Sequence, residues 1–224
     1  MIGQRLRAIV PAGIPASAVL PALCLVSAAL AGVVAWREYT VETIAEAMRD
    51  PLDQGQTVLA DHANDEPAQL SDRANAGLAE IALSAAGQAQ SRGERQLALA
   101  RAGAAVDYLT RRRPDWATTQ LLKAQLDVIQ RGSPSTMGLE AFGASYRQAP
   151  FLMQEARWRI AYGGLYWTRL PVATRDAVLD EAEWLTRFDM AKRPALQTLL
   201  GDGPAGLAYQ FRMASDHDMA SQSD

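Results

Sequence analysis

The sequence contains one cysteine, Cys24, and two histidines, His62 and His217, among 224 residues. A single cysteine cannot form a disulfide bond within the chain, so a disulfide-stabilised scaffold is excluded. A structural zinc site needs four clustered Cys or His ligands, which these three residues cannot supply. No serine or cysteine has an identifiable base partner for nucleophilic catalysis. We therefore expect no metal, no cofactor and no enzymatic activity.

An excess of positive charge is also lacking. Arg5 and Arg7 are two of the 22 Lys and Arg residues, which leaves 20 basic against 25 acidic residues in the rest of the chain. Binding of duplex DNA needs clustered basic residues that neutralise phosphates, so no nucleic-acid partner is expected. The basic run from Arg111 to Arg113 lies at a predicted helix C-terminus. It either complements the helix dipole or binds an anionic glycan or lipid head group.

Strand patterns are absent as well, because no run of alternating apolar and polar residues is long enough to form a strand. Apolar residues instead recur at intervals of three and four positions, which is typical of helices packed by one face. The predicted fold class is therefore all-α.

A long uncharged run, in contrast, is present from Ala8 to Trp36. About 20 helical residues cross the hydrocarbon core of a bilayer, and this run exceeds that length. Inside hydrocarbon every backbone polar group must be satisfied within the segment, so residues 8–36 are predicted to form one transmembrane helix. Trp36 and Tyr39 stand at its far end, where aromatic rings favour the membrane interface.

Three interpretations of this run are open. It is a signal anchor that remains in the membrane, a cleavable signal peptide with Ala29-Leu30-Ala31 as the peptidase motif, or a lipoprotein signal ending at Cys24. Signal peptides usually have an apolar core of about 7–15 residues, and this run is longer. A lipidated cysteine normally follows a small residue, whereas Leu23 precedes Cys24. Both observations favour the signal anchor.

The flanking charges predict an orientation. Arg5, Arg7 and the amino terminus precede the run, while Arg37 follows it and the next basic residue is Arg49. Since basic residues favour the cytoplasmic side, residues 1–7 are predicted to be cytoplasmic and residues 37–224 to lie across the membrane.

The remainder divides into three predicted parts. Residues 37–70 form a juxtamembrane stalk and hinge, in which the spacing of Val41, Ile44, Ala45 and Met48 continues the helix to about Arg49. Residues 71–190 form a helical domain. Residues 191–224 form a C-terminal loop, a short helix and a flexible polar tail, which contains the sequence Asp216-His217-Asp218.

The helical domain shows a weak repeat. Pro114 and Pro150 each end a predicted pair of helices and are 36 residues apart. A helix–turn–helix unit of about 34 residues with a terminal proline is typical of tetratricopeptide (TPR) repeats. The fold predicted is therefore one N-terminal transmembrane helix followed by an antiparallel helix-hairpin, TPR-like array. The alternative is an irregular α-helical domain with coincidentally placed prolines.

The segment from Phe151 to Phe188 holds three of the five tryptophans. These aromatic residues either seal the core of the helical array or, in part, form a surface that docks a partner or stacks on a sugar ring.

Three short motifs carry a resemblance to a family. They are Ala149-Pro150-Phe151, Tyr166-Trp167 followed by Leu170-Pro171, and Thr174-Arg175 followed by Ala177-Val178. Over residues 95–190 the chain resembles small TPR-like proteins encoded beside bacterial exopolysaccharide biosynthesis machinery. The resemblance implies an accessory role in making or exporting an envelope polysaccharide, through protein partners, and brings no catalytic residues. With the predicted orientation, it implies a bacterial inner-membrane protein with a periplasmic domain.

The function predicted is thus a membrane-anchored scaffold that acts by protein–protein interaction. One alternative is a stalk or scaffold subunit of another envelope assembly, such as a secretion or pilus machine. A second is a glycan-processing enzyme that uses two helical carboxylates from among Glu155, Asp180, Glu181 and Glu183. The residues predicted to contact a partner, or a glycan, are Arg111, Arg112, Tyr146, Arg157, Trp158, Arg159 and Tyr166.

A formal G-x-G-x-x-G motif occurs at Gly201-Asp202-Gly203-Pro204-Ala205-Gly206. A dinucleotide-binding fingerprint requires a preceding strand and an acidic residue about 20 positions further on. Proline occupies the loop and the sequence ends 18 residues after Gly206, so this motif is predicted to be a turn.

Overall fold

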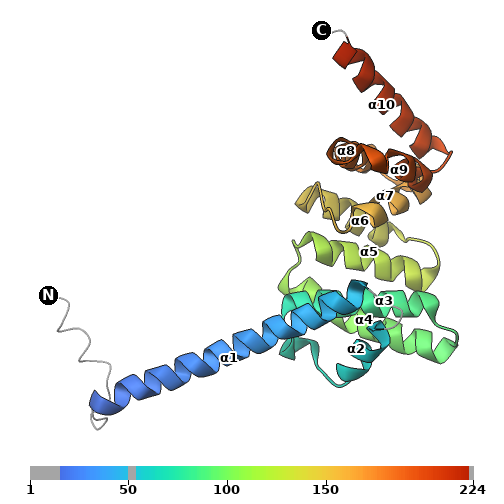
Figure 1. The fold of residues 1–224 in the computed structure, drawn as a ribbon. Coiled ribbons are helices and arrows are strands. Elements are labelled where there is room, and N and C mark those ends of the chain that lie inside the picture. The colour runs from blue at the N-terminus through green and yellow to red at the C-terminus, as the bar shows by residue number, and fades with distance from the viewer. Residues whose placement is uncertain (1–15, 50–53, 222–224) are drawn as a thin grey trace.

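The computed structural model describes residues 16–49 and 54–221 (Figure 1). All regular structure in these ranges is helical, which confirms the predicted all-α class. The predicted cytoplasmic N-terminus and the first residues of the predicted span lie outside the described residues. The α-helices are α1 (Ala16–Arg49), α2 (Gly55–Asp61), α3 (Asp72–Gln88), α4 (Arg92–Arg112), α5 (Ala117–Arg131), α6 (Thr136–Gln148), α7 (Ala156–Leu165), α8 (Val172–Phe188), α9 (Arg193–Leu200) and α10 (Pro204–Ser221).

The helices pack as pairs that follow one another along the chain. Helix α3 packs against α4, and α5 packs against α6, which confirms the predicted pairing around Pro114. Figure 1 shows these helices stacked in chain order from α3 and α4 to α10, while α1 projects from the α3–α4 end. The body of the molecule is therefore a stack of helices with one long arm.

Local signals set several helix boundaries. Ser71 caps α3 by accepting a hydrogen bond from the backbone N–H of Ala74, as its position predicts. Helix α4 starts with a capping box formed by Ser91 and Glu94. Gly93 lies within the first turn of α4, because this capping box satisfies two backbone N–H groups that have no partner inside the helix and so sets the helix start at Arg92.

Three apolar clusters form the core, and shared helices connect them. Helix α3 contributes to a cluster with α1 and α2 and to a second cluster with α4 and α5. Helix α5 places Leu122 in that second cluster and Leu121 in the third, which extends from α5 to α10. Adjacent residues on two faces of one helix thus join the stack into a single body.

Helix α1 has two halves with opposite environments. From Ala22 to Trp36 its side chains are exposed, whereas Thr40, Ile44 and Ala47 are buried. The predicted extension of the helix to Arg49 is confirmed. The buried face differs from the predicted one, because Ala45 and Met48 are exposed. The predicted stalk is therefore part of the packed body rather than a free connector.

The contact between α1 and α3 depends on Gly77. A Cβ atom at this position would lie 2.4 Å from Cγ2 of Ile44, which is closer than real carbon contacts allow. The glycine lets the two helices approach until Ile44 is only 2% exposed. Ile44 is β-branched and stiff, so it cannot swing away to admit a larger residue.

The C-terminal part is more ordered than the sequence predicted. Leu196 and Leu200 of α9 and Ala205 and Tyr209 of α10 belong to the third core cluster. The tail that was expected to be flexible from Ser215 continues α10 to Ser221. These helices extend the domain beyond residue 190 because their apolar residues cover α7 and α8.

The G-x-G-x-x-G motif forms the turn between α9 and α10, as expected. Gly201 ends α9 at a φ of 72°, and a Cβ on Gly206 would lie 1.7 Å from the carbonyl oxygen of Gly201. The preceding element is a helix rather than a strand, so the motif lacks the setting of a dinucleotide site.

One helix in the described residues is long and apolar enough to cross a membrane. The qualifying stretch is Ala22–Met48 of α1, and none of the side chains in its apolar window is buried. This finding rests on length and composition and is consistent with a signal anchor or a signal sequence near the N-terminus.

Substitution Gly77→Ala should destabilise the protein. The added methyl group has to displace the buried Ile44, and such overpacking outweighs the gain in helix propensity, for a net loss of about 1–2 kcal/mol. The measurement is thermal unfolding in detergent, followed by circular dichroism. Gly87→Ala is the control, because a Cβ on this exposed glycine of α3 meets nothing within 4 Å. Equal unfolding temperatures for both variants would contradict the role of Gly77.

Candidate functional site

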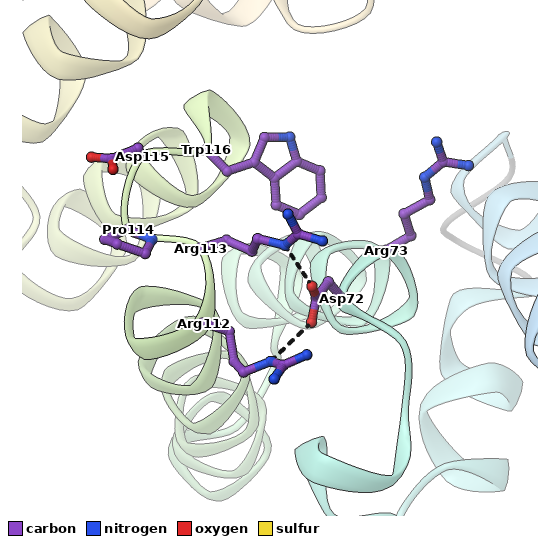
Figure 2. A pocket seen from close by; sticks show the side chains of 7 residues that line it. All are labelled: Asp72, Arg73, Arg112, Arg113, Pro114, Asp115 and Trp116. Atoms are coloured by element: carbon purple, nitrogen blue, oxygen red, sulfur yellow. Dashed lines mark hydrogen bonds and ion pairs between the residues drawn. The ribbon is translucent and has the colours of Figure 1, made fainter. Parts of the chain in front are cut away.

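An open recess at the meeting point of α3, α4 and α5 gathers three arginines. We name it the arginine recess, and it has a volume of about 530 Å³. Figure 2 shows its side chains, which come from the start of α3 and from the end of α4 with the following loop. The recess is lined by Asp72, Arg73, Arg112, Arg113, Pro114, Asp115 and Trp116.

Asp72 organises the recess. Nε of Arg113 donates to Oδ2 of Asp72 at 2.8 Å, and Nε of Arg112 lies 3.8 Å from Oδ1. The carboxylate is largely covered, whereas both arginine side chains are 62% exposed. Figure 2 shows Arg73 directed away from Asp72, with the indole of Trp116 beside Arg113. One carboxylate thus holds two guanidinium groups in place, while the third forms no ion pair with the side chains that the structure describes.

A second recess joins this one to α1. Glu38 and Val41 of α1 line it together with Asp72, Arg112 and Arg113. The arginine recess therefore lies beside the part of α1 that carries the exposed pair Trp36 and Tyr39. The ring centroids of this pair are 6.2 Å apart.

A row of aromatic rings lies at the other end of the stack. We name Phe151, Trp184 and Phe188 the aromatic row, because their successive ring centroids are 5.2 Å and 6.1 Å apart. Phe151 is 46% exposed and Phe188 is 64% exposed, with exposed Met190 nearby in sequence. Contiguous exposed aromatic residues are typical of protein interaction surfaces.

A buried charge network lies beneath this row. Nε of Arg159 is 3.3 Å from Oε2 of Glu181, and both side chains are fully buried. Tyr146 donates its hydroxyl to Glu181 at 2.9 Å, and the backbone N–H of Leu152 donates to the other carboxylate oxygen at 3.0 Å. Burial raises the pKa of Glu181, and the Arg159 charge and these hydrogen bonds oppose that rise.

The guanidinium group of Arg159 also fastens the loop after α6. It donates to the carbonyl oxygens of Ala149 and Pro150 at 3.0 Å and 3.3 Å, and it stacks 3.5 Å from the ring centroid of Tyr146. The loop that carries Phe151 is therefore fixed from inside by the network of Arg159, Glu181 and Tyr146.

The structure separates the predicted contact residues into exposed and buried sets. Arg111 and Arg112 are exposed at the end of α4, and Arg157 is exposed on α7, while Trp158 and Tyr166 are half-buried around Tyr162. Tyr146 and Arg159 are 4% and 0% exposed, so their position suits the core rather than partner contact. The sequence pattern could not show this. An arginine is buried only when it has a partner such as a carboxylate, and the carboxylate that pairs with Arg159 is on another helix.

Arg111 and Arg112 are not brought together with the other predicted contact residues. Arg111 and Arg112 end α4, whereas the remaining predicted residues lie on α6 and α7 and in the turn after α7, with α5 between them in the stack (Figure 1). The predicted contact residues therefore lie in two separate regions of the stack.

Several residues of these surfaces were missed by sequence reasoning. Asp72 is 41 positions from Arg113, but in an antiparallel hairpin the start of the first helix lies beside the end of the second, and this rule would have found it. Phe188 was placed alongside the core and Phe151 was treated as part of a motif. Nothing local in the sequence shows that both are exposed.

The carboxylates of the enzyme alternative are mostly engaged. Glu181 is held in the buried network, Asp180 pairs with Arg212, and Glu183 pairs with Arg187 and Arg212. Among the described residues no group of three or more His, Cys, Asp or Glu side chains is placed to hold a metal ion. The structure does not describe the side chain of His217.

A further pair of carboxylates faces the body side of α1. Glu80 and Glu155 line a recess of about 330 Å³ together with Ala45, Met48 and Gln154. Burial, and secondly the charge of Glu155, raises the pKa of Glu80 from 4.5 to about 7.

Substitution Glu181→Gln should strongly destabilise the protein. Glutamine preserves the size of the side chain but leaves the Arg159 charge buried without a counter-ion, which costs about 3–5 kcal/mol. Glu183→Gln on the same helix is the control, since its partner Arg187 is 65% exposed and such pairs contribute about 1 kcal/mol or less. Chemical denaturation of both variants measures the difference. A loss no larger than that of the control would show that the buried pair is unimportant.

The stability of the protein should fall as pH rises from about 5 to 8. In this window folded Glu80 retains a proton that the unfolded chain has already lost near pH 4.5, so the stabilisation is present at low pH and disappears above about 7. Glu80→Gln should reduce this slope and be more stable than the native chain at pH 8, on the order of 2 kcal/mol. Unfolding curves across the pH range test this, with Glu140→Gln as the control at an exposed site. Parallel curves for Glu80→Gln and the native chain would contradict it.

No protein-family model, curated protein or solved structure matches this chain.

Proposed function

We propose that the chain is a membrane-anchored scaffold that holds a protein partner of bacterial exopolysaccharide synthesis or export machinery. In this proposal α1 is a signal anchor in the inner membrane, the N-terminus is cytoplasmic, and the paired helices form a TPR-like array in the periplasm. The polysaccharide context comes from the resemblance over residues 95–190. The anchor is supported by the length and composition of α1, and the scaffold is supported by the paired packing of the helices.

The observation that carries the proposal is the continuity of α1. One helix of 34 residues has an exposed apolar half and a half whose Ile44 and Ala47 belong to the core of the body. Cleavage after Ala31 would remove the exposed apolar half of α1 and leave Ile44 and Ala47 in the core. The anchor is favoured over cleavage because the uncharged run is longer than the apolar core of a usual signal peptide, and an anchor keeps the exposed half continuous with the packed half.

The partner surface in this proposal is the aromatic row. Phe151 and Phe188 are exposed and adjacent to a half-buried Trp184. Aromatic residues supply much of the binding energy in protein interfaces because they bury large areas while losing little conformational freedom. The exposed Arg157 lines a small cavity with Met153 and Lys192 close to this region, so it remains a proposed contact residue.

The enzyme alternative receives less support, because Glu181 is fully buried and both of its oxygens already accept hydrogen bonds. Glu155 is the remaining carboxylate of that set for which no ion pair is found among the described residues. A Glu155→Gln variant that keeps full function, in a protein that cleaves no glycan, would dismiss this alternative.

Affinity capture from a detergent extract tests the scaffold. The native chain should recover a glycosyltransferase or a polysaccharide exporter, and the double variant Phe151→Ser/Phe188→Ser should recover at least about tenfold less, as expected for losing two interface anchors. The control is Leu97→Ser/Met137→Ser, which removes two exposed apolar residues from α4 and α6.

Two outcomes would contradict the proposal. Recovery of only pilus or secretion subunits would favour a stalk subunit of another assembly. Release of the chain from membranes by alkaline carbonate would show that α1 is not an anchor.

A further inference from the structure

The arginine recess lies at the depth of lipid head groups if α1 is the anchor of the proposed function. Glu38 and Val41, which line the adjoining recess, follow Trp36 on α1 by about 3 Å and 8 Å at 1.5 Å per residue. The exposed rings of Trp36 and Tyr39 mark the membrane interface, because amphipathic aromatic side chains favour that level. The close contact of Ile44 on α1 with Gly77 on α3 holds the guanidinium groups at this depth.

The recess is prearranged for a phosphoryl group. Asp72 engages Arg112 and Arg113 through their Nε atoms, and within the described residues their terminal nitrogens have no hydrogen-bond or ion-pair partner. Arg73, on the other side of Asp72, has no ion pair with the described side chains, and Figure 2 shows it directed away from the carboxylate. The planar fork of N–H donors on arginine matches the oxygens of phosphate.

We propose that the arginine recess binds the phosphodiester head group of an anionic membrane phospholipid. The lining residues carry three positive charges, against Asp72, Asp115 and the neighbouring Glu38. The recess therefore has no large surplus of positive charge. Binding depends on the arrangement of the guanidinium N–H donors and not on long-range electrostatic attraction. A phosphodiester with one negative charge fits this balance better than a head group with several.

The bound lipid would act as a second attachment of the body to the membrane. It would hold the start of α3 and the end of α4 against the surface from which α1 emerges. The body would then stand in one orientation relative to the bilayer, with α8, which carries Trp184 and Phe188, further along the stack than the recess (Figure 1).

Lipid titration of the full chain in detergent, followed by native mass spectrometry, tests this site. Phosphatidylglycerol should bind more tightly than phosphatidylcholine. The triple variant Arg73→Gln/Arg112→Gln/Arg113→Gln should weaken phosphatidylglycerol binding by at least about tenfold, since one arginine near an anionic lipid surface contributes about fivefold. The control triple is Arg92→Gln/Arg147→Gln/Arg193→Gln, which removes the same charge at exposed positions on α4, α6 and α9.

Two further measurements are needed. Competition with free phosphates distinguishes a lipid head group from a soluble phosphate, and a single variant distinguishes lost binding from lost folding. Inorganic phosphate and glycerol phosphate should compete poorly, because they lack the acyl chains that the membrane supplies. Arg73→Gln alone disturbs no ion pair with the described side chains and should still weaken phosphatidylglycerol binding about fivefold.

Several results would overturn the lipid site. They are unchanged binding in the recess variants, equal loss in both triples, or glycerol phosphate binding as tightly as the lipid. Carbonate extraction of the native chain is scored separately. If the chain stays in membranes while recess variants bind lipid normally, the lipid site fails and the anchored scaffold stands. If the chain is extracted, the anchor itself fails.

Discussion

The contact between Ile44 of α1 and Gly77 of α3 is the constraint on which the rest of the structure depends. It buries an isoleucine against a position where any side chain would collide with it. Because the two helices cannot slide past each other without opening this contact, it fixes the part of α1 around Ile44 on α3. The position of the arginine recess along α1, close to Trp36 in sequence, follows from this contact.

The buried pair of Arg159 and Glu181 has a different role. Bringing two charges out of water is unfavourable, and this cost is offset by the mutual attraction of the pair and by hydrogen bonds to Tyr146, Leu152 and two loop carbonyls. The same bonds hold the loop after α6 in one conformation. Phe151 follows directly from that loop, so an interior electrostatic network positions an exposed ring beside Trp184.

Sequence reasoning succeeded where the decisive interactions are local. Ser71 caps the helix that follows it, Gly132-Ser133-Pro134 turns the chain between α5 and α6, and α1 extends to Arg49, because each depends on residues within one or two turns. The buried positions of Tyr146 and Arg159 were missed, since their partner Glu181 is more than twenty residues away.

By itself the sequence determined the all-α class, the pairing of helices around Pro114 and the apolar character of the N-terminal helix, because composition and periodicity depend only on neighbouring residues. Only the tertiary structure decided which charged and aromatic side chains face the solvent. Asp72 meets Arg113, and Phe151 meets Trp184, across separations that no local pattern encodes. Burial is a property of the packed helices together, so the two candidate surfaces could be recognised only after the stack was assembled.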